Sequence, residues 1–265
     1  MDTYQRYRLA RDAAWRTLLR LPEKRLPVDV RALFSLLRIG ILPFPRNGEE
    51  PKLQEILRKA GNPACVSLKI GGVWQVFLRE NVWDESRERF ALAHELGHMI
   101  LHHSVYAIAP GVYAFSAAEN QGDLMDDPQD MEDNEADMFA IRLLAPACIL
   151  HEMHLDAPGN IGNFCGLPPR AAAMRAERME LLNERDAFFT HPMERQVRNA
   201  FLPFIREKKL PQAEVKEEIS PSKKPPSPGR TAFQRMSREK RRFYLAAFML
   251  LLLVIGGILV RLFRG

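Results

Sequence analysis

The segment that most constrains this chain is Arg89–His102, which reads RFALAHELGHMILH. Apolar residues flank a His-Glu-x-x-His motif, and this pattern predicts a helix over the whole segment. His94 and His98 are four positions apart, so a helix places both imidazoles on one face, one turn apart. Two imidazole nitrogens in this arrangement suit a tetrahedral zinc ion, whose bonds to histidine are about 2.0–2.1 Å long. We therefore expect a metal-binding helix here.

Glu95 follows the first histidine directly, at the flank of the expected metal. A carboxylate in this place is suited to act as the general base on a metal-polarised water, so Glu95 is the candidate catalytic residue. A catalytic zinc has three protein ligands and one open position, so the motif needs a third ligand from another segment. The alternative interpretation is a helix whose two histidines are only partly buried and whose Glu95 is a solvated charge.

A second segment, residues 131–146, reads MEDNEADMFAIRLLAP. It predicts a helix with an acidic start followed by an apolar face, and acidic residues near a helix N-terminus are favourable in any protein. Together, the two segments resemble the ImmA/IrrE family of gluzincin-like zinc metallopeptidases, whose pattern is FxLAHELGHxxLH followed by ExEADxFAxxLLxP. A metzincin motif is excluded, because its third histidine would fall at Ser104 and its glycine at Leu101.

The resemblance implies a zinc ligand set of His94, His98 and Asp133. It also implies that Asp137, one turn along, orients a ligating histidine. The sequence departs from the family pattern at Asp133, which is one methylene shorter than the usual glutamate. Glu132 and Glu135 are the alternative third ligands, and loss of the metal from this chain is a further alternative.

Charge and cysteine content narrow the functional class. The net charge of +5 comes from the C-terminal part, because residues 207–242 carry 11 Lys and Arg against 5 Asp and Glu. Residues 1–206 therefore have a charge of about −3, and we expect no direct nucleic-acid binding. The three cysteines have no CxxC spacing and fit buried free thiols in a reducing cytosol.

The remaining pattern predicts an α+β fold, a mainly helical zincin-like domain with a small β-sheet, over residues 1–206. Alternating runs around Gly71-Gly72 predict a β-hairpin, and we expect its second strand to be an edge strand that aligns an extended substrate. Residues 104–130 are expected to be a long connection, and residues 158–185 a helix-turn-helix unit used for packing. The other expected elements are helices over 3–21, 28–37 and 52–60, a strand over 39–44, and an N-cap at Asp84 or Ser86.

The C-terminal part differs in composition. Residues 207–242 are rich in Pro, Lys, Glu and Ser and predict a disordered linker. Residues 243–260 contain no charge and would span about 27 Å as a helix, so we expect a transmembrane helix over 243–263. Basic residues are denser before this span than after it. The positive-inside rule then predicts a single-pass protein of the cell membrane whose N-terminal domain is cytoplasmic.

These expectations combine into a membrane-anchored zinc endopeptidase that acts on a protein or peptide. The family resemblance implies a helix-turn-helix transcriptional repressor, or another regulatory protein, as its substrate. The alternative is a non-catalytic, membrane-tethered sensor or binding protein that retains the zincin fold. Intramembrane proteolysis is excluded, because the flanks of the HExxH motif are too short and too charged to span a bilayer.

Overall fold

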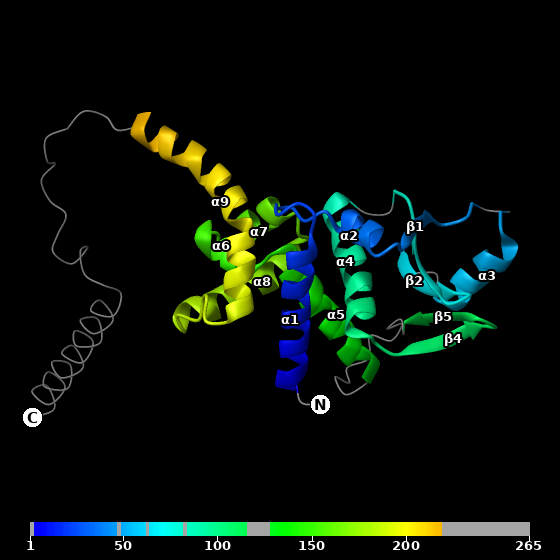
Figure 1. The fold of residues 1–265 in the computed structure, drawn as a ribbon. Coiled ribbons are helices and arrows are strands. Elements are labelled where there is room, and N and C mark those ends of the chain that lie inside the picture. The colour runs from blue at the N-terminus through cyan, green and yellow to red at the C-terminus, as the bar shows by residue number, and fades with distance from the viewer. Residues whose placement is uncertain (1–2, 47–48, 62–63, 82–83, 116–127, 219–265) are drawn as a thin grey trace, which may run out of the picture. The chain divides into compact units, whose positions relative to one another are not determined.

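The computed structural model describes residues 3–46, 49–61, 64–81, 84–115 and 128–218. The chain divides into two compact units, Met1–Glu214 and Val215–Gly265, and every element that forms the site belongs to the first. This unit is mainly helical with a small mixed sheet, so the predicted α+β class is confirmed (Figure 1). The helices are α1 (Thr3–Arg20), α2 (Val30–Leu36), α3 (Pro51–Lys59), α4 (Glu85–Leu101), α5 (Pro128–Leu144), α6 (Ala147–Glu152), α7 (Pro158–Cys165), α8 (Pro169–Glu184) and α9 (Pro192–Glu218). The strands are β1 (Gly40–Pro43), β2 (Cys65–Ile70), β3 (Val73–Leu78), β4 (Val105–Ala109) and β5 (Val112–Phe115).

The five strands form one sheet in the order β1-β3-β2-β5-β4. The predicted hairpin is confirmed as β2 and β3, and its two turn residues, Gly71 and Gly72, have φ values of 57° and 86°, which glycine adopts at little cost. The expectation that β3 is an edge strand is wrong. β1 pairs with it in parallel on its other side, an arrangement between distant segments that local alternation does not reveal.

The outer strand on the other side is β4, which pairs with β5 in an antiparallel hairpin. The prediction of a long unstructured connection after the metal helix is therefore wrong for residues 105–115. Its sequence, VYAIAPGVYAF, contains a Pro-Gly turn between two apolar runs. This pattern predicts a hairpin and could have been recognised from the sequence.

Helices cover both faces of the sheet. The main core joins the sheet residues Cys65, Val76 and Leu78 to the helices, whereas a smaller core packs α3 on the opposite face through Leu57 and Phe77. The sheet lies on one side of α4, and α6, α7 and α8 lie on the side of α5 away from it (Figure 1). The two candidate site helices are thus in the interior of the fold, between the sheet and the helical part.

Three helices pack tightly at the centre: α4 on α5, and α5 on α1. Gly97 makes the close approach of α4 and α5 possible, because a Cβ there would lie 3.1 Å from the Ala136 Cα and 3.1 Å from the Phe139 ring. On the other side of α5, the Arg142 guanidinium lies 4.2 Å from the centroid of the Tyr7 ring on α1. The glycine of the HExxH motif therefore sets the distance between the two helices that carry the candidate ligands.

The predicted helix-turn-helix unit is confirmed as α7 and α8, joined at Gly166. Its apolar positions Ala171, Ala172 and Met179 are buried, and Arg175 on the second helix is only 4% exposed. Burial of this arginine removes one of the cations that a nucleic-acid-reading helix would present.

The last described helix, α9, continues to Glu218. Residues 207–218 are therefore helical, and the expectation that they begin a disordered linker is wrong; Lys, Glu, Gln and Ala, all good helix formers, dominate this segment. Residues 219–242 and the predicted transmembrane helix over 243–263 lie outside the described residues. Within the part of the chain that the structure describes, no helix is both long enough and apolar enough to cross a membrane.

Candidate metal centre

The helix α4 begins at a well-formed cap and carries the HExxH motif in its middle. The Asp84 carboxylate accepts a hydrogen bond of 2.9 Å from the Arg87 backbone N–H, as an N-cap residue should, so Asp84 rather than Ser86 is the cap. Ser86 instead donates its hydroxyl to the same carboxylate. The helix ends at His102, which has a left-handed conformation with φ 56°. A capped helix thus carries the backbone of His94 and His98.

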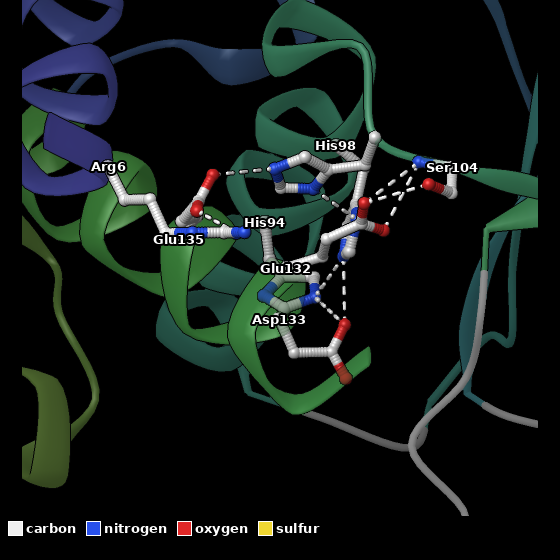
Figure 2. Close-up of polar contacts among 8 residues, drawn as sticks. Arg6, His94, His98, Ser104, Glu132, Asp133 and Glu135 are labelled. Carbon is white, nitrogen blue, oxygen red and sulfur yellow. Dashed lines mark hydrogen bonds and ion pairs between the residues drawn. The ribbon is translucent and has the colours of Figure 1, made fainter. Parts of the chain in front are cut away.

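Three side chains converge between α4 and α5 (Figure 2). The Nε2 atoms of His94 and His98 lie 2.9 Å apart, and the Asp133 Oδ1 lies 3.2 Å from His98 Nε2 and 4.0 Å from His94 Nε2. The ligand atoms of the three residues are all within 4.8 Å of one another. Ligands about 2.05 Å from a tetrahedral zinc ion are roughly 3.3 Å apart, so these separations and this donor set fit zinc.

The other two acidic candidates on α5 lie elsewhere. The Glu132 carboxylate accepts hydrogen bonds from the Ser104 backbone N–H and, at 2.9 Å, from its hydroxyl. Glu135 points to the opposite side, where it contacts His103 and Arg6. Among the described residues, Asp133 is therefore the only carboxylate of the three that the structure brings to the histidine pair.

Asp137 lies next to His94, where the resemblance places it. The His94 Nδ1 and the Asp137 Oδ1 are 2.7 Å apart, which leaves Nε2 directed at Asp133 and His98. Burial lowers the pKa of His94, but the hydrogen bond to Asp137 and the carboxylates of Glu95 and Asp133 outweigh it, so the pKa is raised. Three carboxylates thus act on this imidazole, an arrangement that suits a cation site.

Glu95 is half-buried on α4 and lies near strand β2. Burial raises the pKa of the Cys65 thiol well above its ordinary value, and the carboxylates of Glu95 and Glu88 raise it further. Cys65 is therefore a neutral, buried thiol beside the site, and it is not among the groups that could bind a metal there.

Aromatic rings from the sheet cover His98. The Phe115 ring at the end of β5 stacks on the His98 imidazole, with centroids 5.0 Å apart and an interplanar angle of 23°. The Trp74 ring of β3 stacks in turn on the Phe115 ring, with the two centroids 4.5 Å apart. The sheet thus supplies an apolar wall to one of the two histidines.

Sequence reasoning missed His103. Its Nδ1 lies 2.9 Å from the Nδ1 of His98, and its Nε2 lies 3.2 Å from the Glu135 carboxylate. Burial lowers the pKa of His103, and proximity to His98 lowers it further. His103 follows the end of α4, beyond the helical periodicity, so no spacing rule relates it to His98.

The fold and the site define a class of protein: an HExxH helix packed on an acidic helix, with a His-His-Asp group that could hold a metal between them. This is the arrangement of a metallopeptidase-like domain. Residues 66–177 match the peptidase family model described as the IrrE N-terminal-like domain, which supports the resemblance to the ImmA/IrrE family and indicates a peptidase. No curated protein matches this chain.

The matched segment contains both site helices and the hairpins of the sheet. It leaves out α1, and with it Arg6, which contacts Glu135 on α5. Part of the surroundings of the site therefore comes from outside the matched segment.

Proposed function

We propose that the chain is a zinc-dependent endopeptidase that faces the cytosol and is attached to the cell membrane by a helix over residues 243–263. The observation that carries this proposal is the His94, His98 and Asp133 group, whose ligand atoms lie within 4.8 Å of one another beside Glu95. The match of residues 66–177 to a peptidase family supports the same activity.

His94, His98 and Asp133 would hold the metal, and Asp137 would keep the His94 imidazole oriented through its Nδ1. Bound there, zinc would polarise a coordinated water and lower its pKa towards about 7. Glu95 would accept the proton of the attacking water at its carboxylate and pass it to the nitrogen of the leaving amine. Its position directly after His94 places it at the flank of the ligand group.

The substrate we propose is a protein segment in an extended conformation. β4 is one of the two edge strands of the described sheet, and Glu132, the neighbour of Asp133, binds Ser104 directly before it. An extended chain could pair with this edge through its backbone, which gives affinity without a strict sequence requirement. By the resemblance to the ImmA/IrrE family, a helix-turn-helix repressor or another regulatory protein is the proposed partner.

The experiment that tests the proposal uses Glu95→Gln in the full-length protein in detergent. The amide keeps the shape of the side chain but accepts no proton, so we expect zinc content unchanged and peptide cleavage lowered by about 10²–10⁴-fold. Cleavage is followed with an unfolded protein substrate by mass spectrometry. Full cleavage by the variant would remove Glu95 from the mechanism.

One observation favours a second function. Asp133 stands where the family pattern has glutamate, and a site without turnover would leave a membrane-tethered sensor or binding protein. In that case Glu95→Gln retains every cellular effect of the parent, whereas for an enzyme it abolishes them. The cellular effect of this one variant therefore separates the two functions.

A further inference from the structure

We propose that His103 is a positioning residue for the metal site: it holds the His98 imidazole in place and is itself held by Glu135 and Arg6. This inference rests on the proposed function, because it takes His98 as a metal ligand. It adds a group of three residues that approach the site from the side opposite to the ligands.

The contacts form a continuous series from the site to α1. The Nδ1 atoms of His98 and His103 are 2.9 Å apart, and the two rings are nearly perpendicular, at 81°. The His103 Nε2 lies 3.2 Å from the Glu135 Oε2. The other oxygen of this carboxylate accepts a hydrogen bond of 2.6 Å from Arg6 Nη1 (Figure 2). Four side chains from α1, α4, α5 and the residue after His102 thus connect in line.

Metal binding selects one arrangement of the protons along this series. A ligating Nε2 on His98 presents a lone pair, so its Nδ1 carries the proton and donates it to the Nδ1 of His103. The Nε2 of His103 then carries a proton, which it donates to Glu135, and the Arg6 guanidinium donates to the same carboxylate. Each donor meets one acceptor, so the series favours the tautomer of His98 that binds metal.

Because its partners are more buried, His98 is held more firmly by His103 than His94 is held by Asp137. The side chains of His98 and His103 are each 4% exposed and that of Glu135 is 9% exposed, whereas Asp137, the partner of His94, is 41% exposed. Water can replace a lost partner at Asp137 but has little access to His98, His103 and Glu135, whereas the Arg6 side chain at the far end is 25% exposed. Removing one member would leave buried polar groups unpaired, which is costly.

The central test is the zinc affinity of His103→Phe, which keeps an aromatic ring of similar size but removes both nitrogens. We expect a 10–100-fold loss of affinity, as is typical when a partner of a ligating histidine is removed. His103→Gln supplies one acceptor and one donor and is expected to restore much of the affinity. The matched control is His102→Asn, since His102 is exposed and asparagine tolerates its left-handed conformation.

Arg6→Gln tests the far end of the series without touching α4 or α5, and Arg16→Gln, at an exposed position of the same helix, is its control. We expect Arg6→Gln to weaken zinc binding less than His103→Phe does, and Arg16→Gln to leave it unchanged. This pair keeps the inference testable if His103→Phe does not fold.

Zinc affinity is measured on the full-length protein by competition with a chromophoric chelator. Thermal unfolding of the metal-free protein is measured as well. If His103 had a purely structural role, the variants would change the unfolding temperature, and His103→Gln would not restore the zinc affinity. Equal zinc affinity in the parent, His103→Phe and Arg6→Gln would overturn the role of His103 and leave the peptidase proposal intact. A parent that binds no zinc would overturn the proposed function, and this inference with it.

Discussion

Asp133 reaches the histidine pair although its side chain is one methylene shorter than the glutamate of the family pattern. Its Oδ1 lies 3.2 Å from His98 Nε2, across a close contact between α4 and α5. Gly97 permits this packing, since a side chain there would meet the backbone of Ala136. The shorter side chain therefore reaches the histidine pair across this close helix contact.

Replacing this ligand is the first prediction at the residue scale. We expect the full-length parent to bind about one zinc ion per chain and Asp133→Ala to lose it, because two histidines alone complete no catalytic zinc site. Elemental mass spectrometry of the purified proteins measures this. Glu132→Ala is the control, since its carboxylate binds Ser104. If Asp133→Ala retained zinc, the third ligand would be a residue other than Asp133.

Sequence reasoning at this scale rested on helical spacing for His94 and His98 and on the family resemblance for Asp133 and Asp137. His94, His98, Asp133 and Asp137 lie one turn apart in pairs, and the structure brings them together. It fails for His103 and Arg6, whose relation to the site depends on the left-handed turn at His102 and on the docking of α1. Neither is visible in a local pattern.

At the element scale, the packing of α4 on α5 decides the geometry of the site. Alanine is favoured over glycine in a helix by up to about 1 kcal/mol, but at Gly97 its Cβ would lie 3.1 Å from atoms of α5. Overpacking of this kind costs about 1–3 kcal/mol and moves the helices apart, so steric repulsion exceeds the propensity gain.

Gly97→Ala is therefore predicted to destabilise the metal-free protein and to weaken zinc binding. Urea unfolding and a chelator competition measure the two effects. Gly159→Ala in α7 is the matched control, because nothing lies within 4 Å of its added Cβ, and it is expected to be neutral or stabilising. A Gly97→Ala protein that is as stable as the parent and binds zinc normally would contradict this account of the helix contact.

The contact of α6 with α9 gives a pH-dependent prediction. Burial on its own would raise the pKa of Glu152, but hydrogen bonds from Lys209 and Arg198 outweigh it, so the pKa is lowered from 4.5. A lowered pKa means that the ion pairs stabilise the fold above about pH 4.5 and that this contribution is lost as the pH falls further. Because the two cations are 42% and 36% exposed, we expect a contribution of only about 0.5–1 kcal/mol.

Glu152→Gln should accordingly lower the free energy of unfolding at pH 7, and the difference from the parent should shrink as the pH falls below about 4.5. Urea unfolding at several pH values measures it. A difference that is constant with pH would show that the amide changes packing rather than charge.

Most elements followed from sequence patterns, and the errors share a cause. The helices over 3–20 and 85–101 and the Gly-Gly hairpin came from local periodicity and turn residues. The parallel pairing of β1 with β3 joins segments more than thirty residues apart, so the sequence alone left β3 looking like an edge. The helical residues 207–218 show that proline and charge do not by themselves predict disorder.

At the scale of the whole molecule, the proposed anchor in the C-terminal segment would determine where the site acts. The uncharged run over residues 243–260 and the basic residues before it are the reasons to expect a membrane anchor. An anchor would hold the site near the cytosolic surface and raise its local concentration towards membrane-associated substrates.

Deleting residues 243–265 tests this expectation. The full-length chain should remain in the membrane pellet after carbonate extraction, and the shortened chain should move to the soluble fraction while it retains zinc. Protease added outside intact cells should leave residues 1–206 uncut. A full-length chain that is extracted by carbonate would argue against a transmembrane helix.

The contacts of three acidic residues, Asp133, Glu135 and Asp137, depend on how α5 is rotated about its own axis. Successive residues of a helix are turned by about 100°, so Asp133 and Asp137 face His94 only at the setting that also presents Glu135 to His103 and Arg6. A metal that fixes this setting would also favour the seating of α1, and by linkage the seating of α1 would favour metal. Zinc binding and the docking of the N-terminal helix would then both depend on the rotation of α5 about its axis.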